Sequence, residues 1–196
     1  SKGLLRKARE YAEKNVRIFS TVINESTPLL GVEPSAILSF RDEYPDLVRE
    51  DLRSQAKELA KNVFLIDEFL AAEADKGHIT AAQFTTQKQH IKLHGHCQQK
   101  ALSTPLHSKK ILSLPQNYSV EVIPSGCCGM AGSFGYEKEH YDLSMQIGEL
   151  VLFPAVRNAA EGTIIAAPGT SCRHQVKDGT GAKALHPVEI LYNSLA

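Results

Sequence analysis

Apolar positions in the first third of the chain recur at the spacing of an amphipathic helix, with one short extended run between them. Pro28 and Pro34 bound that run, and proline marks the ends of strands rather than their interior. Asp46 stands where the side chain of a helix cap is expected. The predicted elements are a helix over residues 4–22, a short buried strand over 28–32, a helix over 45–60, a strand or helix start over 62–66, and a polar connection over 75–86.

The rest of the chain alternates short apolar runs with helical patterns more regularly. Strands that are separated by helices pair in parallel, and the helices then cover both faces of the sheet. The sequence therefore predicts an α/β fold, a parallel sheet with helices on both faces. The predicted elements are strands over 89–94, 119–123, 163–167 and 182–185, helices over 97–102, 106–112 and 138–160, a short helix from 171, a helix over 187–195, and a glycine-rich loop over 125–135.

A partial internal repeat underlies this order. Glu33-Pro34-Ser35-Ala36 follows a predicted helix and strand in the same way as Gly169-Thr170-Ser171-Cys172, and residues 66–70 resemble residues 187–191. The pattern predicts one partial and one complete copy of a repeated unit. Because the chain also lacks a starting Met, it is expected to be part of a longer protein. The predicted division is residues 1–86 for the end of a preceding, degenerate copy with its connection, and residues 87–196 for a complete copy.

Charge and composition exclude several classes of function. The 22 basic residues are balanced by 22 acidic ones, which argues against a nucleic-acid-binding stripe or a polybasic membrane anchor. No apolar run approaches the roughly 20 residues of a transmembrane helix, and no signal peptide opens the sequence. Four cysteines are too few for a disulfide scaffold. We therefore expect a reduced, cytoplasmic setting, either in solution or at the inner face of the membrane.

The cysteines fall at informative places. Each of the first three predicted strands of the second half of the chain is followed by cysteine: Cys97, then the adjacent Cys127 and Cys128, then Cys172. The fourth predicted strand is followed by His186. The carboxyl ends of parallel strands lie on one edge of a sheet, where ligands bind. Four thiols at one edge have the number and softness that zinc or an iron–sulfur cluster requires. A scattered cysteine is most often a small buried hydrophobe, but here every cysteine has turn residues beside it.

The neighbouring residues fit an anionic centre. Glycines in these loops let backbone N–H groups approach thiolates, and Cys97 and Cys172 would open helices, whose N-termini favour the thiolate. His94 and His96 flank the first cysteine, and each could bond a sulfur, replace a thiolate as ligand or cap the turn. His186 could be an outer hydrogen-bond donor.

Three motifs carry a family resemblance: HGHCQQKAL around Cys97, CCGMAGSFGYE from Cys127, and PGTSCRHQ around Cys172. Together they resemble the cysteine-rich CCG domain of heterodisulfide reductase B subunits, of glycolate and lactate oxidase iron–sulfur subunits, and of anaerobic glycerol-3-phosphate dehydrogenase. The sequences of the three motifs are most similar to the C-terminal part of large fused FAD/iron–sulfur dehydrogenases of D-2-hydroxy acids. The resemblance covers residues 89–196 well and residues 30–70 as the end of a preceding copy.

Two positions depart from the family pattern. The fullest motif ends in C-x-x-C, but Gln175 stands in place of its last cysteine, which puts a five-thiolate cluster in doubt. In the preceding copy Ala36 replaces a cysteine, so that copy is expected to hold no cluster.

The resemblance implies an iron–sulfur cluster, of the 4Fe-4S type, held by Cys97, Cys127, Cys128 and Cys172. The chain would pass electrons from FAD, bound elsewhere in the same polypeptide, to a quinone or another acceptor. No G-x-G-x-x-G motif is present, so FAD is expected to bind outside this chain. Oxidation of the substrate would take place there too, and no catalytic residue is assigned here. The alternatives are a structural zinc site made by the same thiolates, with His94, His96 or His186 as further candidate ligands, and thiol chemistry without a metal.

Overall fold

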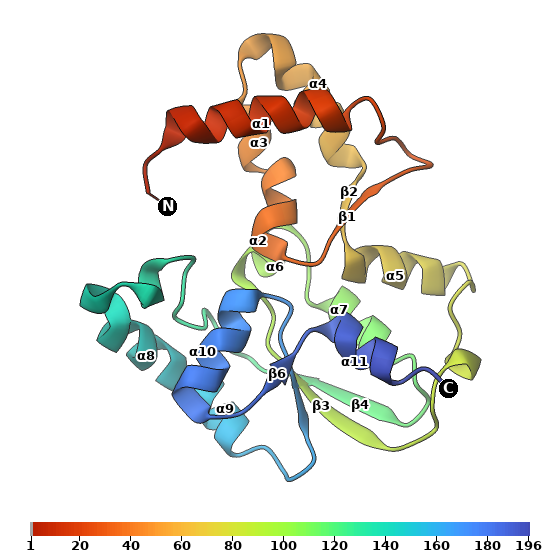
Figure 1. The fold of residues 1–196 in the computed structure, drawn as a ribbon. Coiled ribbons are helices and arrows are strands. Elements are labelled where there is room, and N and C mark those ends of the chain that lie inside the picture. The colour runs from red at the N-terminus through yellow and green to blue at the C-terminus, as the bar shows by residue number, and fades with distance from the viewer. Residues whose placement is uncertain (1) are drawn as a thin grey trace. The chain divides into compact units, whose positions relative to one another are not determined.

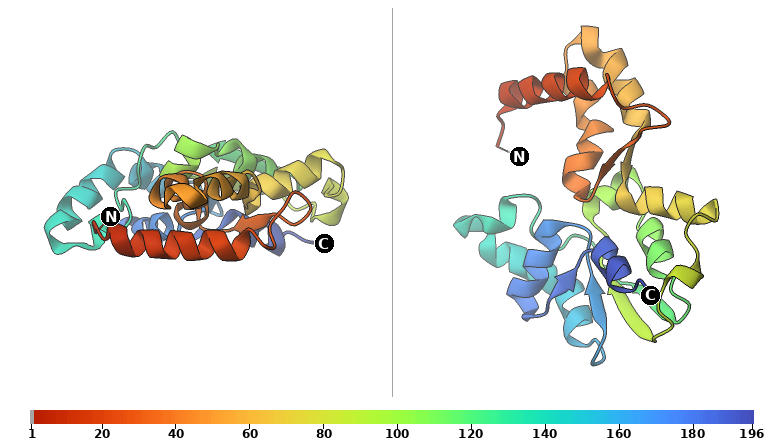
Figure 2. Two further views of the ribbon diagram at one scale, coloured as in Figure 1. Left: turned by 90° about the horizontal axis from the view of Figure 1, so that it is seen from above. Right: turned by 45° about the vertical axis from the view of Figure 1, so that its right-hand side comes forward.

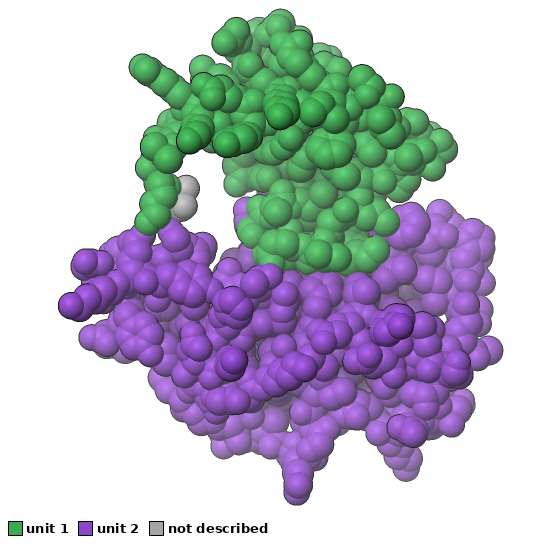
Figure 3. Space-filling model, viewed as in Figure 1, with its two compact units in different colours: residues 1–66 green, residues 67–196 purple. Residues whose placement is uncertain are grey.

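The computed structural model describes residues 2–196. It divides into two compact units, Ser1–Ile66 and Asp67–Ala196, which Figure 3 colours green and purple. This boundary concerns compactness, and the division of the chain at residue 86 into two repeat copies stays a prediction.

Unit 1, residues up to Ile66, is built around two parallel strands in which Leu30 pairs with Phe64. The buried side chains of Val16, Leu38 and Leu59 form part of its apolar interior. Its elements are α1 (Leu5–Phe19), β1 (Leu29–Gly31), α2 (Pro34–Ile37), η1 (Leu38–Phe40), α3 (Glu43–Leu47), α4 (Glu50–Lys61) and β2 (Val63–Leu65), as Figure 1 shows.

The helix predicted over residues 45–60 is in fact two helices, α3 and α4. The backbone is extended at Val48 and Arg49, and the Arg49 N–H that the break frees donates to the Glu13 carboxylate. Glu50 and Asp51 then favour a new helix start through the helix dipole. Asp46 lies inside α3 and makes no cap, so that prediction was wrong. In the undecided segment 62–66, Val63–Leu65 form strand β2 and Ile66 begins helix α5 (Ile66–Asp75).

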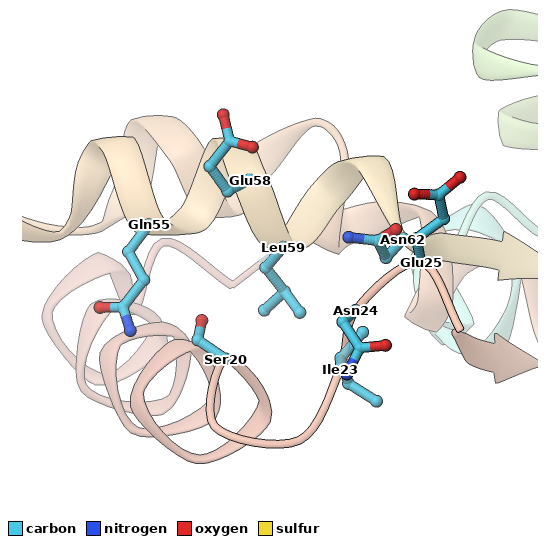
Figure 4. A pocket seen from close by; sticks show the side chains of 8 residues that line it. All are labelled: Ser20, Ile23, Asn24, Glu25, Gln55, Glu58, Leu59 and Asn62. Carbon is cyan, nitrogen blue, oxygen red and sulfur yellow. The ribbon is translucent and has the colours of Figure 1, made fainter. Parts of the chain in front are cut away.

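Unit 1 also carries a hollow of about 300 Å³ between the end of α1 and α4 (Figure 4). Several of its polar side chains serve local structure instead of facing a ligand. Glu58 pairs with Lys61, and the Asn24 side-chain oxygen accepts from the N–H groups of Ser26 and Thr27. We assign this hollow no function.

Unit 2, from Asp67 onward, contains a four-stranded parallel sheet with the order β4-β3-β5-β6. The chain leaves β3 for β4 on one side and returns to β5 on the other, so the topological switch point lies between β3 and β5. Its elements are α5 (Ile66–Asp75), η2 (Ala81–Gln83), β3 (Gln89–Leu93), α6 (Cys97–Leu102), α7 (Leu106–Leu112), β4 (Tyr118–Val122), η3 (Phe134–Tyr136), η4 (Lys138–His140), α8 (Tyr141–Glu149), α9 (Leu152–Arg157), β5 (Ile164–Ala166), α10 (Thr170–Thr180), β6 (Ala184–Leu185) and α11 (Pro187–Asn193).

Helices cover both faces of this sheet, which confirms the predicted α/β class. On one face, Phe153 and Val156 of α9 and Val176 of α10 pack against the sheet. On the other face, Ile111 of α7 and Ile190 of α11 pack against it, together with α5. Figures 1 and 2 show the two groups of helices on opposite sides of the strands. In the part of the chain that the structure describes, no helix is long and apolar enough to cross a membrane.

The prediction of one long helix over residues 138–160 was wrong, because the helix is interrupted between α8 and α9. Pro154 lies in the first turn of α9, where its missing N–H and its ring are tolerated, whereas inside a continuous helix it would clash with the Leu150 carbonyl. The break also lets Phe153 fill a slot between two glycines. A Cβ on Gly148 or on Gly179 would lie 2.3 Å or 2.2 Å from the Phe153 ring.

Candidate metal centre

The candidate centre lies where three strands of unit 2 end. His94 follows β3 directly, and its N–H donates to the Ala166 carbonyl of β5 at 2.8 Å. Cys127 and Cys128 follow β4, and Cys172 lies in the first turn of α10, which follows β5. These strands are adjacent in the sheet, and their carboxyl ends meet at the switch point, the usual ligand position of such sheets. The topology therefore brings residues that are distant in sequence to one edge, as predicted.

His94, Cys128 and Cys172 form the buried part of the centre. Their exposed fractions are 0%, 2% and 1%, and one ring nitrogen and the two sulfur atoms all lie within 4.8 Å of one another. Two thiols and one imidazole form a typical donor set for a soft or borderline metal ion. This trio is therefore a site that could accept a metal without bringing in any solvent-exposed side chain.

The remaining two cysteines extend this trio toward solvent. The thiols are linked by hydrogen bonds in the order Cys97, Cys127, Cys128, Cys172, and none of them forms a disulfide. Cys127 is half-buried, whereas Cys97, at the start of α6, is exposed. The structure thus brings all four predicted cysteines together.

Hydrogen bonding divides the four thiols into two kinds. Cys127 accepts from the Cys128 and Cys97 thiols, and also from the N–H of Gly129, which lies 3.3 Å from its sulfur, so its pKa lies far below the usual range. Donation to Cys127 raises the pKa values of Cys97 and Cys128. The hydrogen bond from Cys128 lowers the pKa of Cys172 to about 5, and His94 contributes to this shift. Hydrogen bonding therefore favours the thiolate form at Cys127 and Cys172.

The loop that carries Cys127 and Cys128 is held in an unusual conformation. Gly129 has a φ of 102°, and Ala131, with a φ of 41°, is the one residue other than glycine with positive φ between residues 2 and 196. Such backbone conformations are strained and concentrate at functional sites. A Cβ on Gly129 would lie 2.1 Å from the Ser144 carbonyl oxygen, so no larger residue fits there. The geometry aims the Gly129 N–H at the Cys127 sulfur.

Three further side chains support this site, and two of them, Lys100 and Ser125, were not singled out from the sequence. Lys100 of α6 donates from Nζ to the carbonyl oxygens of Ser125 and Gly126, at 2.7 Å each, and so anchors the cysteine loop. The Ser125 hydroxyl contacts His94 Nδ1 at 2.7 Å. Gln175, in place of the family's last cysteine, donates to the Ser144 carbonyl and hydroxyl oxygens at 3.0 Å. The one sequence signal for Lys100 was its position, one helical turn after Cys97.

The three candidate histidines differ in what their ring nitrogens do. His96 and His186 are helix caps, and the Nδ1 of each accepts from a backbone N–H of α6 or α11. His96 also packs on Gly169, where a Cβ would lie 2.3 Å from its Cδ2 atom. His94 instead uses Nδ1 for Ser125, and its buried Nε2 has no hydrogen-bond partner among the described residues.

His186 belongs to a second buried polar cluster. The Asp67 carboxylate, at the start of α5, accepts a hydrogen bond from the Ser108 hydroxyl, which in turn accepts from Gln99 Nε2 at 2.9 Å. Burial raises the pKa of Asp67, and the charge of His186 acts in the opposite direction. This cluster is buried between α5, α6 and α7 and is distinct from the thiols.

The donors present fit a metal centre. Tetrahedral zinc with thiolate bonds of about 2.3 Å places its sulfur ligands about 3.8 Å apart, which the 4.8 Å limit of the buried trio allows. Iron–sulfur clusters are likewise held by cysteine thiolates, and hydrogen bonds to those sulfurs tune their potentials. One ring nitrogen of His94 lies within 4.8 Å of the Cys128 and Cys172 sulfurs and is a further donor atom at the same place.

Comparisons with known proteins agree with an oxidoreductase relationship. The chain is 29% identical to D-2-hydroxyglutarate dehydrogenase from Escherichia coli over 191 residues, 97% of this chain and 18% of that protein. It is 28% identical to the enzyme of the same name from Haemophilus influenzae, over 99% of this chain and 19% of that protein. It is 26% identical to the C subunit of anaerobic glycerol-3-phosphate dehydrogenase from E. coli, over 99% of this chain and 47% of that relative.

The chain thus spans less than half the length of each of these relatives. No family model matches the sequence, and no solved structure matches it. The relatives are dehydrogenases or one component of a dehydrogenase by name, in accord with the predicted resemblance to oxidoreductases. The assignment to a CCG domain stays a prediction.

Proposed function

We propose that this chain is the iron–sulfur electron-transfer module of an FAD-linked 2-hydroxy-acid dehydrogenase, with one 4Fe-4S cluster held by Cys97, Cys127, Cys128 and Cys172. The observation that carries the proposal is the convergence of all four cysteines, from three strand ends, into one hydrogen-bonded group of free thiols. The relatives supply the chemical context, because oxidation of an alcohol by a dehydrogenase releases two electrons that must reach an acceptor.

The cluster, when bound, would accept and release one electron at a time. The chain's own residues would hold and tune it. The Gly129 N–H donates to the Cys127 sulfur, Lys100 fixes the cysteine loop, and the packing of α8 to α10 excludes water from Cys128 and Cys172. No described residue is assigned a role in hydride removal from the substrate. That step, and FAD itself, belong outside this chain.

The proposed partners follow from this role. Electrons would arrive from the FAD-binding part of the same polypeptide or of a partner protein, and leave to a quinone or another acceptor. Cys97, the exposed cysteine, marks the side of the centre that faces solvent and therefore the side nearest to an electron-transfer partner. We propose a cytoplasmic location, in solution or at the inner membrane face.

Anaerobic purification followed by iron, zinc and acid-labile sulfide assays and a visible spectrum tests the proposal. We expect iron and sulfide in near-equal amounts and a broad band near about 400 nm, which is typical of iron–sulfur clusters. Cys128→Ser should lose both, whereas His78→Ala, at an exposed histidine outside the centre, should keep both. Iron-free, sulfide-free protein under these conditions contradicts the proposal.

One observation favours a second candidate, a structural zinc site. The buried trio of His94, Cys128 and Cys172 is compact and closed to solvent, as structural zinc sites are, and Cys127 would complete four ligands. Zinc near one equivalent, without colour or sulfide, would establish this function instead.

A further inference from the structure

We propose that His94 is itself a metal ligand through Nε2, and that Ser125 is the residue that positions its ring. This inference deepens the proposed function, because it concerns the same site, and it rests on a metal being bound there. A four-iron cluster or a tetrahedral zinc ion takes four protein ligands, so His94 would replace the exposed Cys97 and give the centre a mixed sulfur and nitrogen ligand set.

The His94 ring lies in the protein interior beside two thiols. The His94 side chain is fully buried, and Nε2 makes no hydrogen bond of normal geometry among residues 2–196, although the ring interacts with the Cys172 sulfur and lowers its pKa. An unpaired buried nitrogen is destabilising, so each such atom in a folded protein requires an explanation. Besides the Ser125 hydroxyl at Nδ1, the polar groups beside this ring are the Cys128 and Cys172 sulfurs. A metal held by those sulfurs would satisfy the nitrogen.

Ser125 engages the other ring nitrogen of His94, with its hydroxyl oxygen 2.7 Å from Nδ1. When Nδ1 carries the proton and donates to that oxygen, Nε2 keeps its lone pair for a metal ion. Metal-bound histidines in proteins are oriented in this way, by a hydrogen bond from the ring nitrogen that does not bind the metal. Ser125 is in turn fixed, because Lys100 Nζ donates to its carbonyl oxygen.

The other two candidate histidines contrast with His94. His96 and His186 already use Nδ1 to accept from backbone N–H groups at the starts of α6 and α11, so their rings have a structural role. His94 lies between strand β3 and α6 and caps no helix. The His94 ring is held by the Ser125 side chain at Nδ1, and the ring lies beside the Cys128 and Cys172 thiols.

The competing explanation is that Nε2 carries the proton and donates to the Cys172 thiolate. The test is X-ray absorption at the metal edge of the full chain, purified anaerobically and, in a parallel sample, loaded with zinc alone. We expect one nitrogen at about 2.0–2.1 Å beside sulfur at about 2.3 Å in the zinc sample. In the iron–sulfur sample, chain labelled with [¹⁵N]histidine should show a strongly coupled nitrogen by electron–nuclear double resonance.

Three variants complete the test. His94→Ala should lose the nitrogen signal, and the matched control His78→Ala should keep it. Ser125→Ala should keep the nitrogen but bind zinc about 10- to 100-fold more weakly, as expected when an orienting partner is removed. The labelled wild-type chain gives an answer even if His94→Ala does not fold.

The outcomes separate this inference from the proposed function. Zinc with nitrogen coordination and no iron would refute the iron–sulfur function and support His94 as ligand. A sulfur-only shell around either metal would overturn the role of His94 and leave the metal centre in place. A chain that takes up neither metal would overturn both.

Discussion

Lys100 holds the loop that carries Cys127 and Cys128, and Lys100→Met is the perturbation that isolates this role. The substitution keeps much of the apolar length of the side chain and removes its charge and its hydrogen-bond donors. Lys100 Nζ donates to two backbone carbonyl oxygens, Ser125 O and Gly126 O, both at 2.7 Å. Its charge also opposes the rise in the Cys97 pKa that the hydrogen bond to Cys127 causes.

The magnitude follows from these two contacts. A hydrogen bond that involves a charged group contributes about 1.5–3 kcal/mol when buried. Lys100 is exposed, so water screens both bonds and competes for the carbonyl groups. We therefore expect a total loss of about 2 kcal/mol in the free energy that holds the loop in place, roughly a 30-fold change in an equilibrium constant.

Zinc affinity, measured by competition with a chromophoric chelator, reads out this loss directly. Lys100→Met should bind zinc about 30-fold more weakly, because part of the binding energy then goes into ordering the loop. Lys100→Arg, which keeps the charge, should recover part of the affinity. Lys88→Met, at an exposed lysine outside the site, is the control and should bind like the wild type. Equal affinities for Lys100→Met and Lys88→Met would refute the reasoning.

Three further predictions concern other residues. Phe153→Ala should lower the free energy of unfolding in urea by about 3–5 kcal/mol, because it empties the slot beside Gly148 and Gly179; a loss under about 1 kcal/mol would contradict that packing. Burial raises the pKa of Asp67 above 3.8, so its stabilising contribution is complete below that pH and lost as the pH rises through the raised pKa. Asp67→Asn should therefore gain stability relative to the wild type as the pH rises above 3.8 in urea titrations, and a constant difference would count against it. In the metal-free chain, iodoacetamide should alkylate the low-pKa Cys127 before the more exposed Cys97 at neutral pH, as peptide mass spectrometry would show; the reverse order would mean that exposure governs reactivity.

The sequence predicts the architecture of unit 2 well because its signals are local. Alternation of short apolar runs and helices implied parallel strands, and the cysteines that follow those runs had to meet at one edge. The starts and ends of α6 and α7 agree with the predicted ranges. The break before α9 was also readable, because Pro154 cannot lie inside a continuous helix.

The parts that could not be predicted depend on contacts between residues distant in the chain. The interruption between α3 and α4 at Val48 is stabilised by Glu13 of α1, and no local sequence pattern predicts it. Similarly, His94 and Ser125 are each ordinary in their own segments, and only the pairing of β3 with β4 brings them within 2.7 Å. Helical spacing places Lys100 near Cys97, but the carbonyl groups that it binds come from the loop after β4.

The strand order of unit 2 would give a metal ion bound at the candidate centre a mechanical role. His94, Cys128 and Cys172 are supplied by three successive strand–helix crossovers, so a bound ion would close two long loops of the chain at once. Closing loops in this way limits the freedom of the unfolded chain, and it ties metal affinity to the assembly of the sheet itself. Loss of the ion would then loosen the sheet edge from β4 to β5, and oxidative damage to the thiols would register as lowered resistance to unfolding as well as altered redox behaviour.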